Sequence, residues 1–170
     1  MTTDQRPAYN GKLIKLYREQ VRLPNGHTVS LEIIRHPGAA LIVPLLTKDS
    51  LLMLRQFRAA VGGFLFELPA GTRDGKESEL SCARREIVEE TGYAARRFTV
   101  LGDIFPVPGY STERIRIFKA QGLVKRVACL EADEVATVHV FTRRKVRCLF
   151  KSGKIKDAKT ICALAMVGWL

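Results

Sequence analysis

Apolar and polar residues alternate along much of the first third of the chain, in short runs that end at turn residues. A period of two is typical of β-strands with one buried face. Strands are therefore predicted at 13–23, 28–35, 39–46, 51–57 and 64–68. The first two flank Pro24-Asn25-Gly26. Because Asn-Gly readily adopts the positive φ angles of a tight turn, these two strands are predicted to form an antiparallel hairpin.

The pattern becomes helical after residue 77. Ser78 is a suitable N-cap, apolar residues recur at positions 80, 83 and 87, and Gly92 can end a helix in the left-handed conformation. A helix is therefore predicted between Ser78 and Gly92. Further strands are expected at 98–105, 113–123 and 135–141, followed by a short helix from Thr142 and a last helix over 157–169.

The mixed order of strands and helices predicts an α+β fold with a mixed or antiparallel sheet. The 170 residues suffice for one core, and no stretch approaches the roughly 20 apolar residues of a membrane span. Since the N-terminus also lacks an apolar signal core, we expect a cytoplasmic protein. The four cysteines lack zinc-ligand spacing and are expected to be reduced thiols.

The chain is strongly basic, with a formal net charge of +11. Such a charge suits nucleic acid, an anionic membrane surface or a small polyanionic substrate, and charge alone does not choose among them. No base-stacking series of aromatic residues is interleaved with the late basic residues, so a solvated basic face is favoured and a nucleic-acid partner is not expected. These late basic residues are Lys125, Arg126, Arg143, Arg144, Lys145, Arg147, Lys151, Lys154 and Lys156.

Five glutamates fall within 14 residues of this basic chain, at positions 77, 79, 86, 89 and 90. On a helix that advances about 100° per residue, Glu86, Glu89 and Glu90 share one arc beside the apolar stripe. Like charges at i and i+4 repel, and carboxylates in the last turn face the negative end of the helix dipole. Glutamates on a solvated face are the simple alternative, but this unfavourable placement favours a bound divalent cation such as Mg²⁺.

The segment from Gly71 to Tyr93 resembles the Nudix box, GX5EX7REUXEEXGU, in which U is a bulky apolar residue. All nine specified positions match without a gap. The resemblance implies a Nudix fold, an α/β/α sandwich with a mixed sheet, here preceded by the N-terminal antiparallel hairpin. It also implies hydrolysis of a nucleoside diphosphate linked to another group, assisted by Mg²⁺ or Mn²⁺.

Segments outside the box resemble one branch of this family, the ADP-ribose and nucleoside diphosphate sugar pyrophosphatases. They are RQFR at 55–58, LFELPAG at 65–71, PGYSTE at 108–113 and KDAKT at 156–160, although position 107 is valine where the branch usually has serine. The branch implies cleavage of the substrate's pyrophosphate bond into a nucleoside monophosphate and a sugar phosphate.

The resemblance also implies roles for individual residues of the box. Glu86 and Glu90 are expected as the first metal ligands, with Glu89 and the carbonyl of Ala70 completing a site for two or more ions. Structural roles are implied for Glu77 and Arg85, by pairing with each other or with the ligand carboxylates, and for Gly71 and Gly92, by backbone freedom where a side chain would obstruct the loop or the helix end.

Outside the box, the branch implies that Arg58 grips the diphosphate, with Arg55 and Glu113 as further substrate-binding residues. The plain alternatives are a surface arginine for Arg58 and an exposed strand carboxylate for Glu113.

A loop glutamate of the branch activates the attacking water. Glu134 aligns best with it, and Glu131 stays possible because the loop is shortened; a solvated loop acid is the alternative for both. Glu89 is a further candidate for a catalytic carboxylate.

Residues 1–36 are expected to form a separate β-hairpin segment and residues 37–170 the Nudix domain. The N-terminal strands of the branch commonly exchange across a homodimer, so a homodimer is implied. A hairpin packed on its own domain is the competing arrangement.

Two other functions stay open. An RNA 5′-end pyrophosphohydrolase would suit the positive charge, but the PGYSTE segment speaks against it. A non-catalytic Nudix-fold regulator that binds a nucleotide would not need to retain Glu86, Glu89 and Glu90, which are all present.

Overall fold

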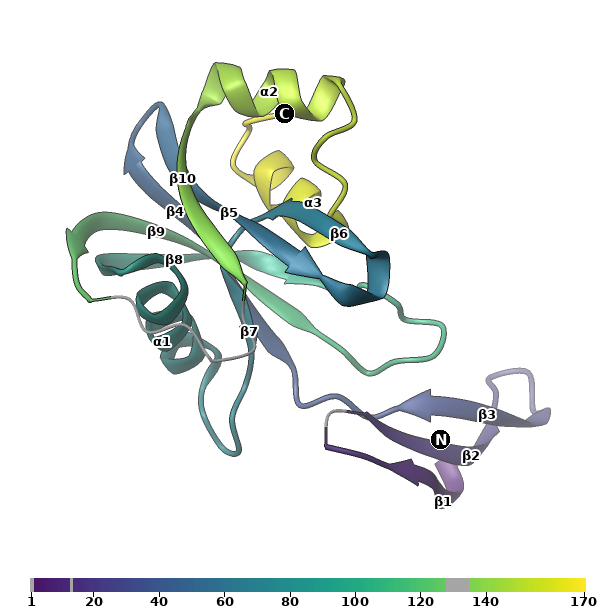
Figure 1. The fold of residues 1–170 in the computed structure, drawn as a ribbon. Coiled ribbons are helices and arrows are strands. Elements are labelled where there is room, and N and C mark those ends of the chain that lie inside the picture. The colour runs from purple at the N-terminus through teal and green to yellow at the C-terminus, as the bar shows by residue number, and fades with distance from the viewer. Residues whose placement is uncertain (1, 13, 128–134) are drawn as a thin grey trace.

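Two β-sheets with no strand in common form the fold of the described residues, together with three α-helices and one short 3-10 helix (Figure 1). The computed structural model describes residues 2–12, 14–127 and 135–170. The larger sheet has the strand order β10-β5-β4-β9-β8, with β6 beside β5 and β7 beside β4. Its strands are β4 (Ala39–Thr47), β5 (Ser50–Arg58), β6 (Gly63–Glu67), β7 (Ala70–Thr72), β8 (Tyr93–Ile104), β9 (Ile115–Lys125) and β10 (Ala136–Thr142).

Strand β4 lies at the centre of the larger sheet and is buried on both faces. Leu41 and Val43 enter the core cluster shared with α2 (Arg143–Lys151) and α3 (Ala158–Met166). Ala40 and Ile42 point the other way, into the cluster shared with α1 (Glu79–Thr91). Helices therefore cover both faces of the sheet (Figure 1), as the α/β/α sandwich requires.

The larger sheet is mixed, as predicted. Strands β4 and β9 pair in parallel, whereas β4 with β5, β5 with β10 and β8 with β9 are antiparallel. The α+β class and the Nudix-type layering are therefore confirmed.

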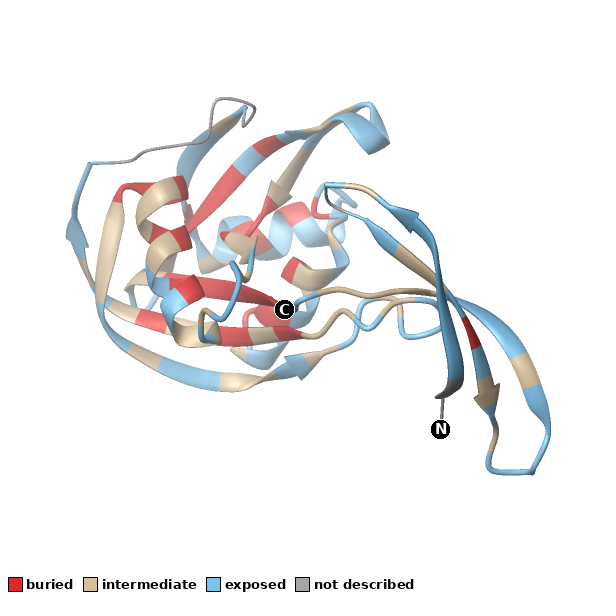
Figure 2. Cartoon of the chain, turned by 90° about the horizontal axis from the view of Figure 1, so that it is seen from below, coloured by how far each residue is buried: buried red, intermediate tan, exposed pale blue. Residues whose placement is uncertain are grey.

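The smaller, N-terminal sheet consists of β1 (Thr2–Asn10), β2 (Lys15–Arg22) and β3 (Thr28–Ile34), all antiparallel. It projects from the body of the molecule and is mostly exposed (Figure 2). Among its described side chains only Glu19 is buried, and there Arg35 and Gln5 donate to its carboxylate at 2.6 and 3.2 Å. This sheet thus has no hydrophobic core of its own.

The predicted hairpin of β2 and β3 is confirmed, but its turn differs from the expected type. Gly26 has a φ of +87°, whereas no residue other than glycine has a positive φ in the described ranges. The connection is closed by hydrogen bonds from Gly26 N–H to the Leu23 carbonyl and from Leu23 N–H to the His27 carbonyl. One glycine with a positive φ is therefore enough to close this turn, and the φ of Asn25 is negative.

Helix α1 begins and ends where the sequence predicts. The Ser78 hydroxyl accepts the N–H of Ser81 at 3.1 Å, and Gly92 takes a left-handed φ of 70°. Helices α2 and α3 start next to the predicted first residues, Thr142 and Asp157, which are their N-caps, but α3 ends at Met166, before the predicted end at Trp169. No helix in the described part of the chain is long and apolar enough to cross a membrane.

The late basic residues are not all free in solvent. Arg143 donates to the carbonyl of Gly168, and Nε of Arg147 donates to the carbonyl of Trp169 at 3.0 Å. Part of the basic cluster therefore binds the C-terminal segment to α2. The prediction of a fully solvated basic face did not foresee these contacts.

Candidate active site

Helix α1 places three carboxylates at the edge of the core. Ala83 and Ile87 are fully buried against the large sheet and fix the rotation of the helix. That rotation leaves Glu86 and Glu90 only 9% and 3% exposed, while Glu89 is half-buried. The placement beside the apolar stripe that the helical period predicted is confirmed.

The backbone of β7 touches two of these carboxylates. The N–H of Ala70 donates to Oε2 of Glu90 at 2.9 Å. A Cβ atom at Gly71 would lie 1.7 Å from Oε1 of Glu86, so a residue with a side chain at this position leaves no room for that carboxylate. Gly71 is not among the glycines with positive φ, and it is therefore needed for space and not for a left-handed backbone.

Arg85 links three carboxylates of the site. Its Nη1 donates to Glu86 at 2.7 Å and to Glu89 at 2.9 Å, and its Nη2 donates to Glu77 at 3.0 Å. The hydrogen bond with Arg85 lowers the pKa of Glu77, and the same bond is the main reason why the pKa of Arg85 is raised. The expected pairing of Glu77 with Arg85 is confirmed, and it offsets repulsion among the carboxylates.

A cavity of about 730 Å³ opens over these residues. Its wall holds four cationic and three acidic side chains, so it offers sites for both a phosphate group and a cation. The lining residues are Lys12, Arg58, Ala70, Gly71, Thr72, Arg73, Asp74, Arg85, Glu86 and Glu89.

Two cations in this wall were missed by the sequence analysis. Lys12 lies between β1 and β2, so the N-terminal sheet contributes to the cavity of its own chain. Arg73 occupies an unspecified position of the box, and its Nε donates to the carbonyl of Glu77 at 2.7 Å. The sequence gives Lys12 no signal of its own, because only the tertiary fold brings it to the box.

Arg58 lies in the cavity wall, as its expected role requires, but its guanidinium already has a partner. Nε and Nη2 donate to the two carboxylate oxygens of Glu67 at 2.9 and 2.8 Å. Glu67 is 1% exposed, and Lys159 also donates to it, at 2.6 Å. Arg58 is therefore held in a fixed orientation and is not a free surface arginine.

The other expected substrate-binding residues lie elsewhere. The guanidinium of Arg55 stacks on the ring of Phe64, 3.8 Å from its centroid. Glu113 is half-buried beside His36, with 4.0 Å between Oε1 and Nε2, near the junction of the two sheets. The structure therefore does not bring Arg55 or Glu113 to the cavity described above. Glu131 and Glu134 lie outside the described residues.

The chemistry of the carboxylates fits a hard divalent cation such as Mg²⁺ or Mn²⁺, which prefers oxygen ligands. In the residues that the structure describes, no group of three or more histidine, cysteine, aspartate or glutamate side chains is arranged to hold an ion by itself. Glu86 and Glu89 both accept hydrogen bonds from Arg85. A cation would compete with Arg85 for those oxygens.

Cys82 lies next to these residues, and its Sγ donates to the carbonyl of Gly71 at 3.4 Å. Burial and then the charge of Glu86 raise the pKa of the Cys82 thiol to about 12. The thiol therefore stays protonated at neutral pH and does not serve as a thiolate ligand.

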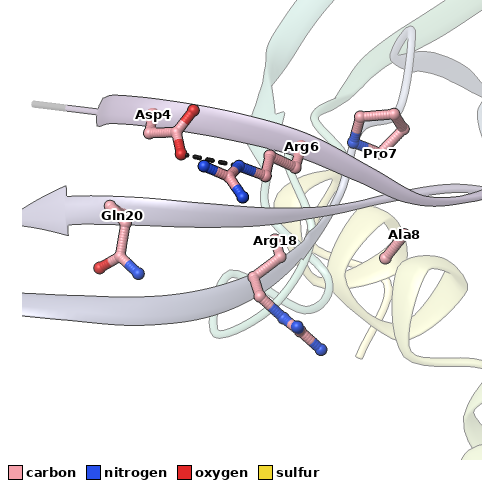
Figure 3. Close-up of a pocket in the computed structure, with 6 residues that line it drawn as sticks. All are labelled: Asp4, Arg6, Pro7, Ala8, Arg18 and Gln20. Atoms are coloured by element: carbon pink, nitrogen blue, oxygen red, sulfur yellow. Dashed lines mark hydrogen bonds and ion pairs between the residues drawn. The ribbon is translucent and has the colours of Figure 1, made fainter.

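A second hollow, of about 530 Å³, lies on the N-terminal sheet (Figure 3). Its charged groups are paired within the sheet, since Arg6 contacts Asp4 at 3.0 Å and Arg18 contacts Glu32 at 3.6 Å. None of the residues that the sequence analysis selected as site residues is among those lining it, which are Asp4, Arg6, Pro7, Ala8, Arg18 and Gln20.

The ion pairs of Glu67 predict a pH dependence of stability. Burial acts to raise the pKa of Glu67, but the hydrogen bond from Arg58 and the charge of Lys159 outweigh it, so the pKa lies below its ordinary value of 4.5. A lowered pKa contributes stability above pH 4.5 that is lost as the pH falls through the folded-state pKa. We expect Glu67→Gln to cost about 2 to 3 kcal/mol at neutral pH.

Melting temperatures measured from pH 7 down to below pH 4.5 check this expectation. The difference between the wild type and Glu67→Gln should shrink with falling pH. Glu32→Gln, at an exposed pair with Arg18, is the control and should change little. A difference for Glu67→Gln that stays constant over this range would show that the carboxylate charge does not stabilise the fold.

Comparisons with known proteins agree with this geometry. The NUDIX domain matches residues 35–164. The ADP-ribose pyrophosphatase of Bacillus subtilis (strain 168) is 34% identical over 158 residues, which are 92% of this chain and 85% of that protein. The methanol dehydrogenase activator of Bacillus methanolicus is 33% identical with the same coverage.

A solved structure described as an ADP compounds hydrolase has a TM-score of 0.85 and 22% sequence identity, and it covers 99% of this chain and 91% of its own. This similarity supports the fold. The domain match and the 34% identical relative show that the sequence is related as well. The chain therefore belongs to the NUDIX domain family.

Proposed function

We propose that the protein hydrolyses the pyrophosphate bond of ADP-ribose or a related nucleoside diphosphate sugar, giving a nucleoside monophosphate and a sugar phosphate. The observation that carries the proposal is the cavity in which Glu86 and Glu89 share a wall with Arg58. A relative that is similar over 92% of the chain bears the name ADP-ribose pyrophosphatase, which supports this substrate class.

Glu86, Glu89 and Glu90, with the carbonyl of Ala70, would hold two or more divalent ions, Mg²⁺ or Mn²⁺. When bound, such ions neutralise phosphate oxygens and lower the pKa of the attacking water. Arg85 holds Glu86 and Glu89 together through its contacts of 2.7 and 2.9 Å, and Glu77 holds Arg85 in place through the 3.0 Å contact.

The cations of the wall would bind the diphosphate. A guanidinium matches phosphate oxygens with two parallel donors, and the side of Arg58 that Glu67 does not use is left for this task. Lys12 and Arg73 add positive charge to the same wall. The substrate's negative charge is thereby balanced without involving the late basic residues of α2.

Glu134 is proposed as the general base, with Glu131 as the alternative. Glu134→Gln is expected to lower kcat by about 10² or more with little change in substrate affinity, because a base acts mainly in the transition state. Glu131→Gln should be mild. Steady-state kinetics with ADP-ribose check both variants: reversed results would assign the base to Glu131, and two fully active variants would place the base elsewhere.

A substrate panel with Mg²⁺ tests the proposed function. ADP-ribose, GDP-mannose, ADP-glucose and a triphosphorylated RNA are compared by the release of their products. We expect the highest kcat/KM with one of the three sugar nucleotides. Preferred release of pyrophosphate from the RNA would favour an RNA 5′-end pyrophosphohydrolase. Binding of nucleotide without turnover of any substrate would favour a non-catalytic regulator.

A homodimer is also proposed, with residues 1–36 as a separate segment that contributes to its interface. A three-stranded sheet without a hydrophobic core is marginal on its own. The N-terminal sheet moreover exposes large apolar side chains, since Tyr9, Ile14 and Leu31 are 60%, 45% and 36% exposed. Light scattering should give twice the mass of one chain, and a monomer at micromolar concentration would contradict the proposal.

A further inference from the structure

Four charged side chains connect the start of α3 to the wall of the active-site cavity. Nζ of Lys159 lies 2.8 Å from Oδ1 of Asp157, the N-cap of the helix, and 2.6 Å from Oε2 of Glu67. Glu67 in turn holds Arg58, which lines the cavity. Lys159 is itself not among the residues that line this cavity, and its chain of direct contacts to the cavity runs through Glu67 and Arg58.

Glu67 is the centre of this arrangement. It is almost fully buried, so its charge must be compensated inside the protein. Oε1 accepts one bond from Arg58, and Oε2 accepts a second bond from Arg58 and the bond from Lys159. The two bonds from Arg58 fix the plane of its guanidinium, and the bond from Lys159 fixes the carboxylate that sets this plane.

The backbone around Lys159 is anchored to the same strand end. The hydroxyl of Thr160, which is fully buried, accepts the N–H of Leu68 at 2.8 Å. Leu68 directly follows Glu67 in the chain, so the first turn of α3 and the carboxylate are held in register. The backbone of Lys159 is therefore held at a fixed distance from Glu67, within reach of the lysine side chain.

Charge balance gives Lys159 a second effect on Arg58. Lys159 shares its charge between Asp157 and Glu67, so it offsets part of the negative charge that faces Arg58. Without Lys159, the charges of both Glu67 and Asp157 would act on Arg58 uncompensated and would weaken its attraction for an incoming anion. We propose that Lys159 is a positioning residue for the hydrolysis: by holding and neutralising Glu67, it orients Arg58 and leaves the charge of Arg58 available to the substrate diphosphate.

This inference rests on the proposed function of Arg58 as a diphosphate ligand, and it predicts a defined kinetic signature. Lys159→Met, which keeps the aliphatic stem, should lower kcat/KM for ADP-ribose about 10-fold, mostly through a higher KM. Lys159→Arg should restore kcat/KM to within about 3-fold of the wild type, because it restores the charge. Lys154→Met removes an exposed lysine from the loop before α3 and should leave both constants unchanged.

A double-mutant cycle with Arg58 tests whether Lys159 acts through it. In an Arg58→Met background, Lys159→Met should change kcat/KM by less than about 2-fold, because the guanidinium that Lys159 is proposed to orient is absent. An equal loss in both backgrounds would overturn the inference, and so would a failure of Lys159→Arg to restore KM. Melting temperatures are recorded for every variant, and Lys159→Gln, which still donates to Glu67, replaces Lys159→Met if that protein does not fold.

Failure of the proposed function and failure of the role of Lys159 give different results. A wild-type protein that does not turn over ADP-ribose or any other sugar nucleotide would overturn the proposed function itself. An active wild type with an additive cycle would overturn only the assignment of Lys159.

Discussion

Replacing Glu86 with glutamine is expected to lower kcat by about 10² or more, and Glu90→Gln should have a similar effect. Glutamine keeps the size of the side chain and an oxygen that can accept the existing hydrogen bonds from Arg85 and from the N–H of Ala70. The fold should therefore survive, while one negative charge is lost from the proposed metal site. Steady-state kinetics with ADP-ribose and Mg²⁺ measure the loss.

Glu79→Gln is the matched control on the same helix. Glu79 lies in the first turn of α1, contacts Arg114 at 2.6 Å and Arg73 at 3.7 Å, and is not itself among the residues lining the cavity. Because Arg73 is proposed to bind the diphosphate, an effect of this replacement should appear in KM, while kcat should stay within about 2-fold of the wild type. If Glu86→Gln and Glu90→Gln both stay within a few-fold of the wild type, these carboxylates do not belong to the catalytic site.

Gly71→Ala is the second substitution with a large expected effect. The new methyl group would occupy the space of the Glu86 carboxylate, with 1.7 Å between Cβ and Oε1. Because the end of a glutamate side chain can swing away, we expect a moderate loss of stability, about 1 to 3 kcal/mol. Activity should fall by about 10², since a displacement of roughly 1 Å at a catalytic group has an effect of that size.

Gly63→Ala in β6 is the control for this experiment, because a Cβ atom there meets nothing within 4 Å. It should leave kcat/KM and the melting temperature close to those of the wild type. Measuring both quantities for both variants separates the displacement of Glu86 from a general effect of adding a methyl group. An active Gly71→Ala enzyme would mean that the observed position of Glu86 is not required for turnover.

Local signals were sufficient for the parts of the fold that depend on nearby residues. Helix α1 was predicted to its ends because Ser78 and Gly92 are strong capping residues and the apolar period between them is regular. Strand β1 was not predicted, since its sequence is polar and shows no alternation. Strand β7 was not predicted either, because Pro69-Ala70-Gly71 has the composition of a turn, and only its pairing with β4 makes it a strand.

In the candidate site, too, the features set by nearby residues could be predicted from the sequence, and those set by tertiary contacts could not. The cluster of Glu86, Glu89 and Glu90 follows from spacing along one helix, and the pairing of Glu77 with Arg85 was implied by the resemblance to the Nudix box. Lys12 and the contact of Lys159 with Glu67 depend on elements far apart in the sequence, so no local pattern reports them. For Arg55 the sequence predicted a role that the structure does not support. Its guanidinium stacks on the ring of Phe64 in the neighbouring strand β6 and does not line the cavity.

The proposed cleavage of a sugar nucleotide's pyrophosphate bond by the box carboxylates can be followed at the phosphorus atoms themselves. The most direct measurement is ³¹P NMR of ADP-ribose incubated with the purified protein and Mg²⁺, beside a parallel reaction with Glu86→Gln. The diphosphate signals should be replaced by those of AMP and ribose 5-phosphate with the wild type and should persist with the variant. Unchanged diphosphate signals with the wild type, or equal turnover by both proteins, would show that the box carboxylates do not catalyse this cleavage.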